Sequence, residues 1–215
     1  MDLNFDKAYL SDKVRIICGL DEAGRGPLAG PVVAGACVLP EDAEIEFLND
    51  SKKLSEKKRD ALYDVITEKA LYWGVGIATA EEIDEINILN ASLLAMRRAV
   101  ENAGITPDLL LVDGNIDRDF NEPAIAIVGG DAKSPSIAAA SIIAKVTRDR
   151  MMAEIDREFP GYGIAGHKGY PTKAHKLAVY RLGPAPCHRR SFLSFLDRDR
   201  EKLAKWDAEE KAKGK

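Results

Sequence analysis

Short apolar runs in this chain lead directly into acidic residues at three places, and this feature constrains the fold most. The runs and the acids that follow them are Val14 to Leu20 before Asp21 and Glu22, Leu109 to Val112 before Asp113, and Ala124 to Val128 before Asp131. Short runs rich in valine, isoleucine and leucine predict buried strands. Acids at the ends of such strands converge at one edge of an α/β sheet, where these folds build their sites.

The remaining pattern predicts two more strands and five helices. The strands are at Pro31 to Leu39 and Leu71 to Ala78, and the helices are at 55–70, 88–103, 135–159, 173–182 and 197–213. Ser55 is placed to cap the first helix, and Gly104 follows the second. This order indicates an α/β domain with a mixed β-sheet flanked by helices. We expect a core over residues 12–160 and a helical C-terminal extension over 161–215, packed on that core.

The cysteines and the hydropathy of the chain indicate a cytoplasmic protein. The three cysteines are odd in number and show no spacing typical of a zinc site. Cys18 and Cys37 lie in apolar runs, where we expect small buried side chains rather than reactive thiols. No apolar stretch reaches the roughly 20 residues that span a bilayer, and the start lacks the order of a secretory signal.

Positive charge is concentrated in one part of an acidic chain. The formal net charge is −4, which argues against binding a polyanion by bulk attraction. However, the segment from Gly161 to Leu196 contains no acid and holds several cations, namely Lys168, Lys173, Lys176, Arg181, Arg189 and Arg190. This segment indicates either a local surface for a polyanion or a solvated basic helix face.

The four strand-end acids favour a metal site. Carboxylates that crowd together repel one another and need a cation between them. Oxygen ligands suit magnesium or manganese, and two such ions roughly 4 Å apart support phosphodiester hydrolysis. Each acid alone also fits a simpler role in a turn or a helix cap. Asp149 is interpreted as an ordinary surface acid of the long helix, with a position near the metal site as the alternative.

Longer motifs resemble a known family. Residues 19–31 read GLDEAGRGPLAGP, and the same family pattern continues through DSKKLS at 50–55, VDG at 112–114, GGDAKSPSIAAASIIAKVTRDR at 129–150, HKGYPTKAH at 167–175 and HRRSF at 188–192. The chain resembles the type 2 ribonucleases H, the bacterial ribonuclease HII family, over about residues 12 to 196. The resemblance implies a ribonuclease H-like fold.

The resemblance also assigns roles to individual residues. It makes Asp21, Glu22, Asp113 and Asp131 the catalytic, metal-binding acids. Substrate contacts fall on Gly24, Arg25 and Gly26 at the 2′-hydroxyl of a ribonucleotide, on Tyr170 at the next sugar, and on Lys52, Lys53, Ser141 and Lys145 at phosphates. Glycine suits a backbone that must approach a sugar closely.

The implied activity is endonucleolytic hydrolysis of the RNA strand of RNA/DNA hybrids. The resemblance further implies cleavage 5′ of single ribonucleotides in duplex DNA, with two Mn²⁺ or Mg²⁺ ions and with 3′-hydroxyl and 5′-phosphate ends. We expect a monomer that acts in ribonucleotide excision repair and binds no membrane. Two other hypotheses are a nuclease of the same fold that cuts DNA and a hybrid-binding module without catalysis.

Overall fold

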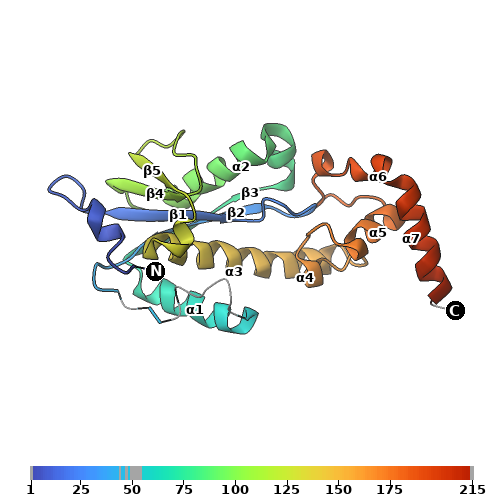
Figure 1. Cartoon of the computed structure of the whole chain (residues 1–215), viewed down its shortest axis with the longest axis horizontal. Coiled ribbons are helices and arrows are strands. Elements are labelled where there is room, and N and C mark those ends of the chain that lie inside the picture. Colours follow the sequence, from blue (N-terminus) through green and yellow to red (C-terminus); the bar gives the residue numbers. More distant parts are fainter. Residues whose placement is uncertain (1, 44, 47, 49–54, 214–215) are drawn as a thin grey trace.

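A five-stranded mixed sheet forms the centre of the molecule (Figure 1). The computed structural model describes residues 2–43, 45–46, 48 and 55–213. The sheet order is β3-β2-β1-β4-β5, with bounds Tyr72–Ala78, Val32–Val38, Ile17–Ala23, Leu109–Asp113 and Ala124–Ile127. Pairs β1–β2 and β2–β3 are antiparallel, whereas β1–β4 and β4–β5 are parallel. The acidic ends of β1 and β4 are therefore neighbours at one edge.

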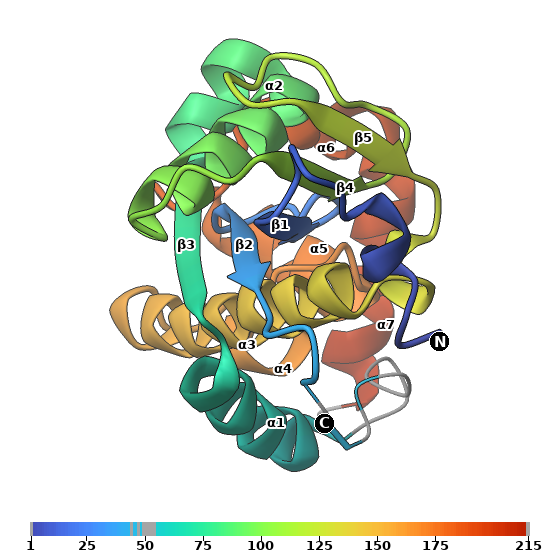
Figure 2. The same ribbon diagram turned by 90° about the vertical axis from the view of Figure 1, so that its left-hand side faces the viewer.

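Helices cover both faces of this sheet (Figures 1 and 2). Helix α2 (Ala80–Asn102) lies on one face, and α3 (Pro135–Glu158) lies on the other. Helix α1 (Glu56–Lys69) packs outside α3 and forms an outer layer. The core therefore consists of two apolar layers, one on each side of the sheet.

The backbone of helix α3 lies directly against the backbone of the sheet. A Cβ atom added to Gly19 of β1 would lie 2.2 Å from the carbonyl carbon of Ser136. One added to Gly35 of β2 would lie 2.3 Å from the carbonyl oxygen of Ala140. No side chain fits in these gaps, so glycine is required at both positions.

The C-terminal helices gather at one end of the molecule (Figure 1). They are α4 (Ile164–His167), α5 (Lys173–Leu182), α6 (Phe195–Arg198) and α7 (Arg200–Lys213). Short 3₁₀ turns occupy Asp6–Tyr9, Gly130–Ala132 and Arg190–Phe192. Leu203 of α7 is fully buried in a cluster with Leu28, Val179 and Phe195, which attaches the last helix to the rest of the chain.

The predicted strands and most predicted helices are confirmed, including the cap at Ser55, whose hydroxyl accepts from the N–H of Lys58. Three expectations were wrong. Helix α2 begins at Ala80, because Thr79 and Glu82 form a capping box, and the chain kinks at Asn87. Strand β5 is a half-buried edge strand rather than the buried strand that was expected. The last predicted helix is divided at Asp199 into α6 and α7.

The apolar character of the cysteines is also confirmed. Cys18 and Cys37 are buried in the two apolar layers on either side of the sheet, and burial raises the pKa of the Cys18 thiol to about 12. Both thiols are therefore protonated at neutral pH. Within the described residues, no helix is both long and apolar enough to span a membrane.

Candidate active site

A cleft of about 450 Å³ opens where β1 and β4 end. It is lined by nearly all the residues that the sequence singles out, together with a few others, namely Asp21, Glu22, Ala23, Gly24, Arg25, Gly26, Arg59, Asp113, Asp131, Ser141, Ile142, Lys145, Arg148 and Tyr170. The four predicted acids thus share one cavity with the glycine loop and the tyrosine. Predicted contacts at Lys52 and Lys53 lie outside the described residues.

Asp21 and Glu22 occupy the end of β1 in different environments. Asp21 is only 7% exposed, and its Oδ1 accepts a hydrogen bond of 2.7 Å from the N–H of Glu22. The hydroxyl of Ser141, on α3, is close enough to Asp21 to lower the pKa of its carboxyl group. Glu22 instead forms an ion pair with Arg25, whose Nη1 lies 3.2 Å from Glu22 Oε1.

Asp113 and Asp131 belong to a second strand end and the turn that follows β5. Asp113 Oδ1 accepts from the N–H of Gly130 at 2.6 Å. Gly129 adopts a left-handed conformation with φ of 63° and begins the short 3₁₀ turn that carries Asp131. One hydrogen bond therefore links the end of β4 to the turn that presents the fourth acid.

Burial and crowding raise the pKa values of two of the acids. Burial raises the pKa of Asp21 well above its usual value, and the negative charges of Glu22 and Asp113 raise it further against the effect of the Ser141 hydrogen bond. Burial also raises the pKa of Glu22, although Arg25 opposes that change. Unfavourable ionisation of this kind is relieved by a cation.

The donor chemistry of the cleft fits a hard divalent cation. All four acids offer carboxylate oxygens, and the described residues that line the cavity include neither histidine nor cysteine. Among the described residues, no group of three or more histidine, cysteine, aspartate or glutamate side chains lies close enough together to hold a metal ion. A cation would therefore have to draw the carboxylates closer together.

The loop after β1 forms a second wall of the cleft. Gly24 has φ of 99°, and a Cβ atom added there would lie 2.1 Å from Arg148 Nε. A Cβ atom on Gly26 would lie 3.8 Å from Cε1 of Tyr170, so the ring lies beside this loop. Tyr170 is 44% exposed and faces the same cavity as the acids.

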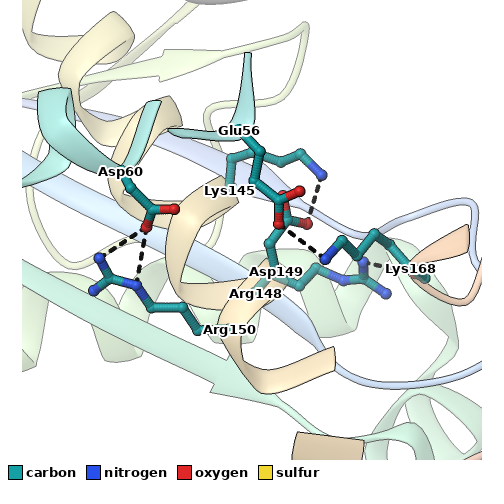
Figure 3. Close-up of polar contacts among 7 residues, drawn as sticks. All are labelled: Glu56, Asp60, Lys145, Arg148, Asp149, Arg150 and Lys168. Carbon is teal, nitrogen blue, oxygen red and sulfur yellow. Dashed lines mark hydrogen bonds and ion pairs between the residues drawn. The ribbon is translucent and has the colours of Figure 1, made fainter. Parts of the chain in front are cut away.

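The interpretation of Asp149 as a surface acid was wrong. Asp149 is buried on α3, and its Oδ1 accepts a hydrogen bond of 2.7 Å from Lys145 Nζ one helical turn away (Figure 3). Figure 3 also shows that Lys168 and Arg150 pair with acids of α1, namely Glu56 and Asp60. The Arg150 pair joins α1 to α3, the Lys168 pair joins α1 to the end of α4, and Asp149 holds Lys145.

The acid-free segment is only partly a basic surface. Arg189 is fully buried and makes its contacts with backbone carbonyls. Arg181 pairs with Asp207, and Lys173 lies near two glutamates of α7. Sequence reasoning also missed Arg59 and Arg148 as cleft residues, because an arginine on a helix gives no sign of the direction it faces.

Comparisons with known proteins identify the family. The family model for ribonuclease HII matches residues 18–195. A ribonuclease HII from Lachnoclostridium phytofermentans is 57% identical over 182 residues, which cover 85% of this chain and 72% of that protein.

Solved structures show the same fold. Ribonuclease H2 from Pyrococcus horikoshii matches with a TM-score of 0.69 and 30% identity, over 89% of this chain and all of that one. Bst ribonuclease HIII in complex with Mn²⁺ matches with a TM-score of 0.67 and 20% identity, over 82% of this chain and 67% of that one. The chain belongs to the ribonuclease HII family and is accordingly a ribonuclease H, an endonuclease that acts on RNA/DNA hybrids and produces 5′-phosphate ends.

Proposed function

We propose that the enzyme cleaves duplex DNA on the 5′ side of a single embedded ribonucleotide as well as the RNA strand of hybrids. One observation carries this proposal: the four acids, the Gly24–Gly26 loop and Tyr170 line a single cleft. A cleft that combines acids with sugar-facing elements provides both hydrolysis and recognition. The enzyme would then act in the removal of ribonucleotides from DNA, as a cytoplasmic monomer.

Asp21, Glu22, Asp113 and Asp131 are proposed to hold two divalent cations, Mg²⁺ or Mn²⁺. The raised pKa values of Asp21 and Glu22 support this assignment, because a bound cation favours their ionised forms. When bound, such ions activate water and stabilise the leaving oxygen. The Mn²⁺ in the Bst ribonuclease HIII structure belongs to that protein, and it makes manganese the second ion to test.

Recognition of the sugar is assigned to the loop and the tyrosine. Among the described residues, the N–H groups of Arg25 and Gly26 have no protein acceptor, so both are open to a 2′-hydroxyl. Tyr170 offers a half-exposed ring next to Gly26. A ring at that position accepts the face of a deoxyribose and crowds a sugar that carries a 2′-oxygen.

Phosphate contacts are assigned to side chains that line or flank the cleft. Lys145 is one-third exposed and is held by Asp149, so its ammonium group has a fixed position for a phosphate oxygen. Ser141 lies one turn earlier on α3 and lines the same cleft. Lys52 and Lys53 complete the proposed set from the segment before α1.

Three duplexes of identical sequence test the proposal, one with a single ribonucleotide, one with a continuous RNA strand and one of DNA alone. Each is incubated with Mg²⁺ and then with Mn²⁺, and the product ends are mapped. We expect cuts 5′ of the ribonucleotide and no cut in the DNA duplex. Cleavage of the DNA duplex would favour a nuclease without sugar recognition, and binding without any cleavage would favour a hybrid-binding module.

A further inference from the structure

Arg189 reaches from the C-terminal part of the chain into the loop between β1 and β2. Its side chain is fully buried and donates four hydrogen bonds to backbone carbonyls of this loop. The acceptors are Gly24 at 2.6 Å, Arg25 at 3.0 Å, Pro27 at 2.8 Å and Gly30 at 2.9 Å. One guanidinium therefore binds both ends and the middle of the loop.

This arginine has no carboxylate at ion-pair distance within the described part of the chain. Other arginines do pair with acids, as Arg98 does with Glu82 and Arg181 does with Asp207. Burial, with the positive charge of Arg148 nearby, lowers the pKa of Arg189 to about 9, so it remains charged at neutral pH. A buried charge is costly unless polar groups satisfy it, and here the loop carbonyls do so.

Other contacts at the same place reinforce this arrangement. The N–H of Arg189 donates to the carbonyl of Leu28, and Ala29 forms an isolated bridge with His188. Arg148 enters from α3 and donates to the carbonyls of Ala29 and Pro31. The carbonyls of the loop thus accept hydrogen bonds from Arg189 and Arg148. The N–H groups of Arg25 and Gly26, in contrast, have no acceptor among the described residues.

We infer that Arg189 is a positioning residue for sugar recognition, because it fixes the backbone conformation in which Gly24–Gly26 meet a ribonucleotide. The inference rests on the proposed function, which assigns sugar recognition to that loop. Only a planar group with several N–H donors reaches all four carbonyls. Lysine keeps the charge but not this geometry, so Arg189→Lys separates the two properties.

The experiment measures binding rather than turnover, using fluorescence anisotropy with Ca²⁺ in place of Mg²⁺. The probes are a duplex with one ribonucleotide and an all-DNA duplex of the same sequence. We expect Arg189→Lys to reduce the ratio of the two dissociation constants at least fivefold, toward one, with less than a twofold change for the DNA duplex. Trypsin should also cut after Arg25 in this variant faster than in the wild type.

Arg98→Lys serves as the matched control, since Arg98 also donates to a carbonyl, that of Ile77, away from the cleft. It should lower the unfolding midpoint and leave the binding ratio unchanged. If Arg189→Lys leaves the ratio of the two dissociation constants unchanged, the inference alone is wrong. If the wild type itself binds both duplexes equally, both the assigned role of the loop and the inference are wrong. If neither Arg189→Lys nor Arg189→Gln folds, Arg189 is a residue of the fold and the inference is wrong.

Discussion

The Nε2 atoms of His175 and His188 lie 3.1 Å apart in the interior beneath the tyrosine of the cleft. Since one ring must donate and the other accept, the pair cannot hold two extra protons. The ring of His167 stacks on His175 at 4.2 Å, and His175 Nδ1 contacts the carbonyl oxygen of Tyr170 at 3.0 Å. The buried ring of His175 therefore supports the backbone of Tyr170.

This pair predicts a loss of stability in acid. Burial lowers the pKa of His175 to about 4, with smaller effects from His167 and His188. The unfolded chain binds the proton near pH 6.5 and the folded chain only near pH 4, so the stabilisation is complete above pH 6.5 and is lost as the pH falls between these values. The loss should approach about 3 kcal/mol.

Urea unfolding at pH 7.5 and 4.5 measures this effect in the wild type and in His175→Gln, which retains polar groups but does not titrate. The wild type should lose more stability than the variant. Acids and histidines that do not contact His175 titrate in both proteins, so their contributions cancel in the difference. Equal losses in the two proteins would show that His175 is already protonated in the fold or is not buried in solution.

Asp21→Asn should abolish cleavage while binding of the hybrid survives. The amide keeps the shape of the side chain but removes the charge of a proposed metal ligand, and repulsion of phosphate falls, so binding should tighten slightly. Asp113→Asn should behave in the same way. The matched control is Asp117→Asn, at an exposed position. Near-normal turnover of both cleft variants in Mg²⁺ would refute the metal assignment.

Magnesium should stabilise the folded protein without any substrate. A cation that binds only the native state adds about 2.7 kcal/mol at a hundredfold excess over its dissociation constant. This increase should vanish in the Asp21→Asn, Asp113→Asn double variant. In the absence of metal, Asp21→Asn alone should be more stable than the wild type at pH 7, since burial disfavours the ionised carboxylate. Thermal melts with and without Mg²⁺ check both points.

Tyr170→Ala should distinguish the two classes of substrate. Loss of an aromatic platform costs about 1 to 3 kcal/mol, so cleavage at a single ribonucleotide should fall roughly tenfold or more. Cleavage within a continuous hybrid should fall less, because the next sugar there carries a hydroxyl. Tyr72→Ala is the control, as Tyr72 is similarly exposed on β3. Equal losses on both substrates would make Tyr170 a general structural residue.

The strand-end acids could be predicted from local pattern, whereas the substrate-contact roles of the loop and Tyr170 came from the resemblance to a known family. Strand ends place Asp21 and Asp113, and the glycines mark the loop where the backbone approaches other groups. Contacts between residues far apart in the sequence could not be predicted in this way. Arg189 and Asp149 look like surface charges in sequence, and only the packing of α3 and the C-terminal helices on the loop shows that they are buried. The early start of α2 also escaped prediction, since its first turn is largely polar.

The glycine contacts between the sheet and α3 separate stability from catalytic geometry. Gly19 and Gly35 meet main-chain atoms of α3, which do not change rotamer as side chains do. The separation between α3, which carries Ser141, and β1, which carries Asp21, is therefore set by contacts with backbone atoms rather than by side-chain packing. Substitutions in the layer on the α2 side, away from Leu20 and Val112, should therefore change the melting temperature more than the dimensions of the cleft, so stability and catalytic geometry can change separately.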